Sequence, residues 1–346
     1  MTDRYPSPRR RGAWITPTLA LAAAACLGIG AMALPAAAQD KSQDKGKTAT
    51  WPTGPVRLIL PFGAGSATDV SARLIADRLS SQWKQPVLVD NRPGGDGLIA
   101  ISAFVNAKDD HVMLFASSAT FLAHPYTQKT VPYDLKRDFA PVAQVSHTVL
   151  TASASAKSGI QSLNDLVKRA KETPDKVNVA GAAGLPEFAV DAFIKSQGLK
   201  ATKVPYRDVV QAGRDLGADH IQFLLSSFAV VRPLMESGQI KVLALGGRER
   251  SKLLPEVPSV VEAGHPELVV ETTAGLYGQK DMPIELRQRI AKEVMDALAD
   301  EKIGSRIFQS GQDVAPGGPE VLKETIERQE KAAASVAKTL DMKRLH

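Results

Sequence analysis

Short apolar runs alternate with helix-like segments along most of this 346-residue chain. The runs at 56–60, 112–116 and 240–245 have the length of buried strands, whereas 162–171 and 283–299 show helical periodicity. Apolar strands separated by helices are typical of parallel strands that are joined by helical crossovers. The alternation therefore predicts an α/β fold with parallel-rich sheets flanked by helices.

The remaining runs extend this pattern to both ends of the folded region. Further strands are predicted at 86–89, 142–152, 177–180, 202–205 and 221–225, and further helices at 98–107, 187–197, 209–216, 230–237 and 319–340. A chain of this length can bury a sizeable core without disulfides, and it is expected to do so in two lobes.

The first strand is followed by a turn of small residues and then by a helix. Phe62, Gly63, Ala64, Gly65 and Ser66 form this turn, and the helical spacing that follows makes Ser66 or Thr68 the expected N-cap. Backbone N–H groups at the start of a helix lack intrahelical partners and sit at the positive end of its dipole. The segment therefore predicts a small seat for an anion.

Three other loops of small residues follow predicted strands, at 117–120, 181–186 and 226–227. Ligands of α/β proteins bind at the carboxyl ends of the strands. Small side chains leave backbone N–H groups accessible and hydroxyls add adaptable donors, so this pattern favours a carboxylate ligand. Asp69 is the acid nearest the seat. It is expected either to tie down its own loop or to accept from an ammonium group, because it would repel a carboxylate that faced it directly.

The first 38 residues are predicted to be a secretory signal peptide. An arginine-rich start is followed by an alanine-rich apolar run and an A-x-A site, which indicates cleavage after Ala38. Arg9, Arg10 and Arg11 leave twin-arginine export as an alternative to the general route. A lipid anchor on Cys26, the single cysteine, is a second alternative. Residues 39–50 are polar and are expected to form a flexible leader, and the localisation is predicted to be periplasmic.

The charge and the motifs argue against several classes of function. The formal net charge is +6, but four arginines and one aspartate lie within residues 1–38, so the rest carries only +3. This weak, scattered charge does not indicate nucleic-acid binding. We find no nucleophile elbow, dinucleotide or Walker motif, and no histidine spacing typical of metal sites. No enzyme activity, cofactor or metal is therefore predicted.

Five segments match, in order, motifs of one transport family. These motifs are P-F-x-x-G-G-x-x-D at 61–69, E-N-R-P-G-A-G-G at 90–97, L-P-Y-D…D-F at 131–139, V-P-Y-K at 204–207 and P-D-V-P-T-x-x-E-A-G at 255–264. The chain therefore resembles the Bug family, the periplasmic substrate-binding components of tripartite tricarboxylate transporters. The match extends over nearly the whole chain from Trp51 onward.

The resemblance implies a two-lobed, type II-like periplasmic-binding-protein fold that closes on its ligand like a flytrap. Residues 51–151 and 268–346 would form lobe 1, residues 152–267 would form lobe 2, and two crossing strands would be the hinge. The expected function is a solute receptor that captures a small organic carboxylate and delivers it to the membrane subunits of the transporter. The receptor is expected to be a monomer. A periplasmic sensor subunit, or a diverged paralogue that binds an aromatic or short aliphatic acid, is the alternative.

The resemblance also carries over a set of ligand-binding positions from both lobes. In lobe 1 these are Phe62, Gly65, Ser66, Ala67, Thr68, Asp69, Ser117, Ser118 and Thr120, and in lobe 2 they are Gly184, Leu185, Pro186, Glu187, Tyr206, Ser226 and Ser227.

The chain departs from the family pattern chiefly in the loop of lobe 2. Leu185 stands at a position that usually carries a hydroxyl, Pro186 lacks a backbone donor, and Glu187 adds negative charge. These departures predict a ligand with one carboxylate and a less polar remainder.

Overall fold

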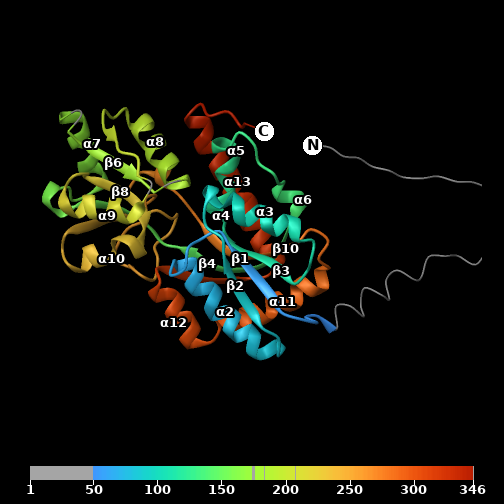
Figure 1. The fold of residues 1–346 in the computed structure, drawn as a ribbon. Coiled ribbons are helices and arrows are strands. Elements are labelled where there is room, and N and C mark those ends of the chain that lie inside the picture. Colours follow the sequence, from blue (N-terminus) through green and yellow to red (C-terminus); the bar gives the residue numbers. More distant parts are fainter. Residues whose placement is uncertain (1–49, 174–175, 183, 207, 346) are drawn as a thin grey trace, which may run out of the picture. The chain divides into compact units, whose positions relative to one another are not determined.

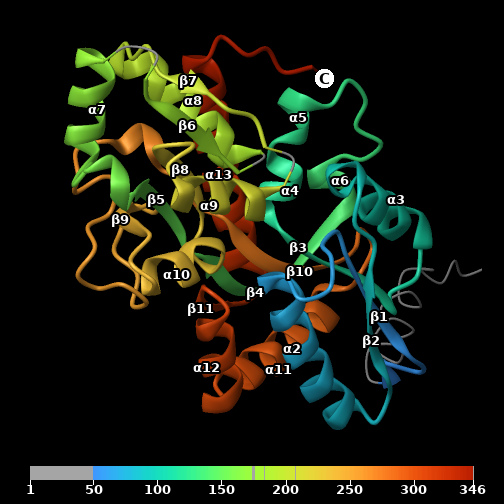
Figure 2. The ribbon, with the colours of Figure 1, turned by 60° about the vertical axis from the view of Figure 1, so that its left-hand side comes forward.

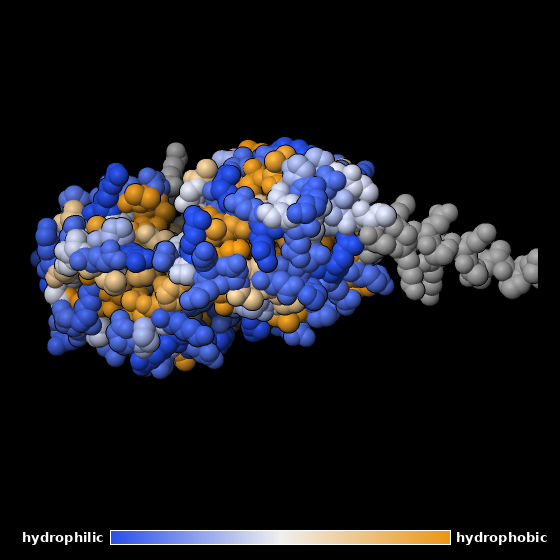
Figure 3. Space-filling model, turned by 90° about the horizontal axis from the view of Figure 1, so that it is seen from below, coloured by the Kyte–Doolittle hydropathy of each residue, from blue (hydrophilic) through white to orange (hydrophobic). Residues whose placement is uncertain are grey.

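The computed structural model describes residues 50–173, 176–182, 184–206 and 208–345. The predicted signal peptide, Cys26 and all but the last residue of the predicted leader lie outside these residues. Within the described part, no helix is both long enough and apolar enough to cross a bilayer. On the face drawn in Figure 3, hydrophobic side chains form small patches among hydrophilic ones.

The described strands form two sheets (Figure 1). The first has six strands in the order β11-β4-β10-β3-β1-β2. Its strands are β1 (Val56–Leu60), β2 (Val87–Asn91), β3 (Val112–Ser117), β4 (Phe139–Thr148), β10 (Thr273–Gln279) and β11 (Gln312–Gly317).

The second sheet has five strands in the order β7-β6-β8-β5-β9. Its strands are β5 (Leu150–Ser155), β6 (Asn178–Gly181), β7 (Thr202–Lys203), β8 (Phe223–Ser227) and β9 (Ile240–Leu245). Each sheet is mixed: β1 is parallel to β2 and β3, and β6 is parallel to β7 and β8, whereas the pairs that involve β4, β5 or β10 are antiparallel. The α/β class is as predicted, and the antiparallel strands are those at which the chain passes from one sheet to the other.

Helices cover both faces of each sheet (Figures 1 and 2). On the first sheet, α2 (Ala67–Trp83), α11 (Ile284–Leu298) and α12 (Glu301–Gln309) pack on one face, and α3 (Leu98–Ala107), α4 (Ser118–Leu122) and α13 (Pro319–Thr339) pack on the other. On the second sheet, α7 (Leu163–Glu172) and α8 (Leu185–Gln197) lie opposite α9 (Val209–Ala218) and α10 (Phe228–Glu236). The short helices are α5 (His124–Thr127), α6 (Leu135–Asp138) and the 3₁₀ turns Gly95–Gly97, Ala156–Ser158 and Pro266–Leu268.

The last three residues of β1 are apolar because both faces of the strand are covered there. Leu58 and Leu60 point toward α2 and α11, whereas Ile59 points toward α3 and α4. Successive side chains of a strand alternate between faces, so the part of β1 that is covered on both faces is apolar at each position, whereas Arg57 near its start is exposed. All three residues are at most 1% exposed.

The predicted strand 142–152 is two strands that belong to different sheets. The break falls at Val149, whose N–H donates to the Gly311 carbonyl (3.1 Å) and whose carbonyl accepts from the Phe228 N–H (2.8 Å). A second crossing connects β9 to β10, where the Val270 N–H donates to the Gly246 carbonyl (2.7 Å). The two sheets are therefore connected by backbone hydrogen bonds at the crossings.

Strands β10 and β11 were not predicted from the sequence. All seven residues of β10 are buried, but Gly275 and Gly278 interrupt its apolar run. Both glycines are tightly packed, since a Cβ on Gly278 would lie 2.5 Å from Met282 Sδ and a Cβ on Gly275 would lie 3.3 Å from the Ala143 carbonyl oxygen. Strand β11 is polar and contains Pro316, which is tolerated because β11 is an edge strand.

Tyr277 gives a first testable prediction. Its ring packs edge-on against Phe121 (5.5 Å between centroids), and its hydroxyl is buried with no partner among the described residues. An unpaired buried hydroxyl is costly, so Tyr277→Phe is expected to raise the free energy of unfolding by about 1 kcal/mol. Urea unfolding would measure this gain, with the partly buried Tyr126→Phe as a control that should change little. A loss of stability in Tyr277→Phe would show that the hydroxyl is paired in solution.

Candidate functional site

The predicted anion seat forms at the start of α2. Of the two candidates Ser66 and Thr68, Ser66 is the N-cap, and its Oγ accepts from the Asp69 N–H (3.2 Å). Gly65 has φ +84°, which glycine adopts without strain. The N–H groups of Ala67 and Thr68 have no partner among the described residues, as expected for the first turn of a helix. Two backbone donors are therefore available at the positive end of a 17-residue helix.

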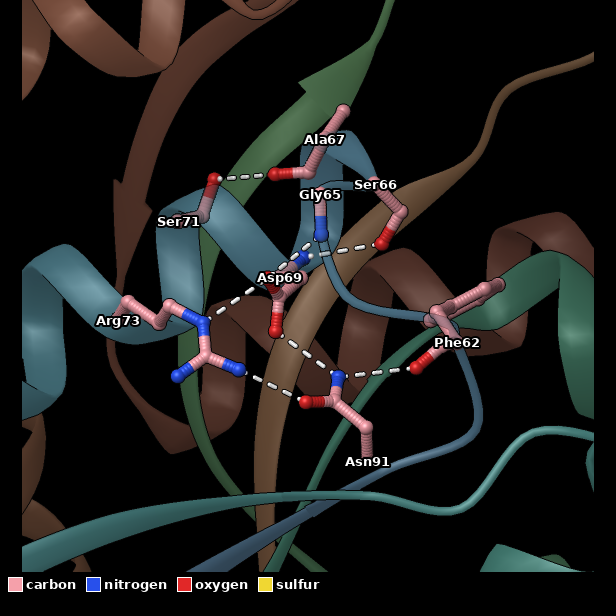
Figure 4. Close-up of polar contacts among 8 residues, drawn as sticks. All are labelled: Phe62, Gly65, Ser66, Ala67, Asp69, Ser71, Arg73 and Asn91. Carbon is pink, nitrogen blue, oxygen red and sulfur yellow. Dashed lines mark hydrogen bonds and ion pairs between the residues drawn. The ribbon is translucent and has the colours of Figure 1, made fainter.

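Asp69 lies at the centre of a hydrogen-bond network that fixes this loop (Figure 4). Its Oδ2 accepts from the Gly65 N–H (2.9 Å) and from Arg73 Nε (3.0 Å), and its Oδ1 accepts from Asn91 Nδ2 (2.8 Å). Asn91 Nδ2 also donates to the Phe62 carbonyl (2.9 Å), and Arg73 Nη2 donates to Asn91 Oδ1 (2.8 Å). The network joins both ends of the loop to the end of β2.

The same hydrogen bonds act on the charge of Asp69. Burial would raise the pKa of its carboxyl, but the hydrogen bonds from Arg73, Gly65 and Asn91 outweigh burial and hold the pKa below its ordinary value. Asp69 is thus an ion-paired carboxylate with its oxygens engaged within the protein. Of the two roles predicted for it, the structure shows the one that ties down its own loop.

Ser117 ends β3, Ser118 begins α4, and both serines are buried. Strand β3 is parallel to β1, so the loops that follow the two strands begin side by side. Ser118 Oγ accepts from the Thr273 N–H (3.0 Å), so this hydroxyl positions β10. The methyl group of Thr120 lies close to Gly97, where a Cβ would be 2.4 Å away. Ser118 and Thr120 therefore have structural contacts of their own.

The second group of predicted residues begins after β6. Gly184 is the N-cap of α8 and has φ +91°. Pro186 lies in the first helical turn, where a missing N–H breaks no intrahelical bond. Leu185 is 9% exposed and belongs to the core shared with α13. Glu187 pairs with Lys203 (3.0 Å). The expectation that Leu185 and Glu187 shape the ligand's surroundings is therefore weakened, since both side chains have partners within the protein.

Tyr206, Ser226 and Ser227 complete this group. Tyr206 Oη donates to Asp215 Oδ2 (2.7 Å), and burial together with this bond raises the pKa of Tyr206 to about 12. Ser226 is fully buried, and Ser227 is the N-cap of α10 without a side-chain capping bond. Because β6 and β8 are parallel neighbours, the loop after Gly181 begins beside these serines.

The structure thus brings the predicted residues together in two groups, one at each sheet. Among the described residues, no hydrogen bond connects one group to the other. Three positioning residues were not predicted: Arg73, Asn91 and Gln312. Gln312 Nε2 donates to the Ala67 carbonyl (2.8 Å) and to Ser71 Oγ (2.7 Å). The four-residue spacing of Asp69 and Arg73 was a usable signal, whereas no local pattern identifies Gln312.

Two histidines, the buried His124 and the partly buried His147, predict a pH dependence of stability. Burial lowers the pKa of His124 and of His147. In the unfolded chain both histidines have the ordinary pKa of about 6.5, so the unfolded chain binds more protons than the folded protein does. The free energy of unfolding therefore falls as the pH decreases below about 6.5. Thermal melting at pH 7.5 and 5.5 should show this loss, and His124→Gln should reduce it. The exposed His220→Gln is the control, and an unchanged pH dependence in His124→Gln would contradict the assignment.

The described residues contain no cluster of three or more histidine, cysteine, aspartate or glutamate side chains that could hold a metal ion.

The architecture is that of the periplasmic binding proteins. The structure of Rpa4515 from R. palustris, solved with adipate, superposes with a TM-score of 0.74 at 26% identity, covering 84% of this chain and 99% of the other. A UPF0065 protein of Bordetella bronchiseptica is 32% identical over 269 residues, 78% of this chain and 80% of that protein. BugT of Bordetella pertussis is 28% identical over 258 residues, 73% of this chain and 79% of BugT.

The family model described as the tripartite tricarboxylate transporter family receptor, TctC, matches residues 71–340. The chain belongs to this family, which confirms the resemblance to the Bug proteins. It is accordingly a receptor and not an enzyme.

Proposed function

We propose that this protein is a periplasmic receptor that captures a small organic carboxylate between its two sheets and delivers it to the membrane subunits of a tripartite tricarboxylate-type transporter. Lobe 1 would consist of residues 51–151 and 268–346, and lobe 2 of residues 152–267. The crossings at Val149 and between Gly246 and Val270 would be the hinge. The predicted signal peptide, with cleavage after Ala38, would direct the protein to the periplasm.

The observation that carries this proposal is the seat at the start of α2. The unpaired N–H groups of Ala67 and Thr68 match the two oxygens of a carboxylate, and the helix dipole adds favourable charge. The nearest acid, Asp69, is already paired with Arg73. The seat therefore offers donors without a competing free carboxylate.

The second group would contact the remainder of the ligand. Glu187 and Tyr206 are held by Lys203 and Asp215, so backbone groups near Gly184 and the serines at the end of β8 are the proposed contacts. A structural relative was solved with adipate, an aliphatic dicarboxylate. For this chain we propose a short aliphatic or aromatic acid with one carboxylate and a less polar remainder.

A thermal-shift screen of residues 39–346 tests the proposal. The panel contains adipate, malate, citrate, benzoate and butyrate, each over a range of concentrations. A ligand that binds only the folded state stabilises it by about 2.7 kcal/mol at a hundredfold excess over Kd. A concentration-dependent rise in melting temperature with an acid of the panel is the expected result.

The outcomes separate the alternatives. Preference for butyrate or benzoate supports the proposed ligand class, whereas preference for adipate, malate or citrate, which carry two or three carboxylates, overturns that class but retains the receptor. A folded protein that responds to none of the acids overturns the carboxylate receptor. Co-purification with the membrane subunits in the presence of the bound acid tests delivery, and a failure there would favour the sensor alternative.

A further inference from the structure

The Asp69–Arg73 pair lies in the same helical turn as the seat. Arg73 Nε is 3.0 Å from Asp69 Oδ2, and the Asp69 side chain is only 3% exposed, against 49% for Arg73. Asp69 also accepts a hydrogen bond from the N–H of Gly65, which precedes Ala67 by two residues. A carboxylate bound by Ala67 and Thr68 would therefore lie within a few bonds' length of a second, buried carboxylate.

Two carboxylates this close repel each other strongly where water is excluded. If Asp69 had no cationic partner, its negative charge would repel the carboxylate that the N–H groups of the seat bind. Arg73 supplies that partner from the turn that follows. Asn91 keeps the guanidinium in place, because its Oδ1 accepts from Arg73 Nη2 (2.8 Å) while its Nδ2 donates to Asp69 (2.8 Å).

We propose that Arg73 is the positioning residue that makes the seat selective for anions, because it cancels the charge of Asp69 without contacting the ligand. This inference rests on the proposed function. The selectivity for anions would then come from the Asp69–Arg73 pair, which does not contact the ligand. Binding would require that this pair be neutral, and not that residue 73 be an arginine.

The surrounding charges support this reading. Among the described residues, Arg73 is the charged group that acts on Asp69, and Gly65 and Asn91 add neutral donors. Arg73 also lies near Asp77, one turn further along α2. Asp77 is exposed, so its charge is screened by solvent.

Three variants test the inference by titration calorimetry with adipate, or with the tightest-binding acid of the panel if that is a different one. Arg73→Gln removes the charge and is expected to weaken binding at least about tenfold. Arg73→Lys keeps the positive charge but loses the guanidinium group that donates to both Asp69 and Asn91. Its Kd should stay within about threefold of the wild-type value. The double variant Asp69→Asn/Arg73→Gln is again neutral and should recover most of the affinity lost in Arg73→Gln.

Recovery in the double variant is a result that a purely structural role would not produce, since two native side chains are then missing. Arg78→Gln removes an exposed arginine of the same helix and should bind as the wild type does. Arg73→Gln with wild-type affinity, or a double variant as weak as Arg73→Gln, would overturn the inference. If Arg73→Gln does not fold, the affinities of Arg73→Lys and of the double variant test the inference. A large loss of affinity in either variant would overturn the inference. A wild-type protein that binds no acid would instead overturn the proposed function.

Discussion

Asp69→Ala is expected to lower the free energy of unfolding by about 3 kcal/mol and to weaken carboxylate binding roughly thirtyfold. The substitution removes three accepted hydrogen bonds at once and leaves Arg73, Asn91 and the Gly65 N–H without their acceptor. Loss of a buried charged acceptor costs more than loss of a neutral one. The loop would no longer be held to β2, so the amides of the seat would lose their fixed orientation.

Urea unfolding and calorimetry on the same preparations would measure both effects. Asp77→Ala is the matched control because it removes an exposed aspartate from the same helix, and its stability should change by less than about 0.5 kcal/mol. If Asp69→Ala kept wild-type stability and affinity, contacts other than this network would have to hold the loop.

Gly181→Ala is expected to destabilise the fold by about 2–3 kcal/mol through a steric clash at the second sheet. A Cβ at this position would lie 2.6 Å from the Cα of Glu187, 2.7 Å from the carbonyl oxygen of Pro186 and 2.8 Å from the N of Glu187. These are backbone atoms of the first turn of α8, so the clash can be relieved only by moving the helix away from β6. The same displacement would shift Gly184 and weaken ligand binding.

Circular dichroism during urea unfolding would report the loss of stability. Gly54→Ala is the control, since nothing lies within 4 Å of a Cβ at that position and its φ is not positive. Equal stability of the two variants would mean that α8 can shift on β6 at little cost.

Local signals in the sequence were sufficient for much of the fold. The apolar run 56–60, the Ser66 cap and the helix from Ala67 were predicted because each depends on neighbours within a few residues. The helix predicted over 162–171 depends on the same kind of signal, and the structure has it as α7 with Ser162 as the N-cap. The placement of the small-residue loops at strand ends also followed from the sequence, because the carboxyl ends of parallel neighbours share one edge of a sheet.

Non-local contacts explain what the sequence did not reveal. Gln312 is 245 residues from Ala67, so no spacing rule connects them. The role of Asp69 was undecided because it depends on Asn91, which lies in a different strand. Likewise, Glu187 was expected to add free negative charge, but Lys203 comes from β7 to neutralise it.

The position of β10 determines the order in which the two sheets can form. Strands of the second sheet come from one continuous stretch, Leu150–Leu245, whereas β10 (Thr273–Gln279) must insert between β3 and β4, which precede it by more than a hundred residues. For a chain that emerges with its N-terminus first, the second sheet can pair while β3 and β4 still expose unpaired backbone edges. Completion of the first sheet must therefore wait for the last quarter of the chain, and pairing over such long separations is slow. A binding partner for nascent chains would find its longest-lived target at those two edges.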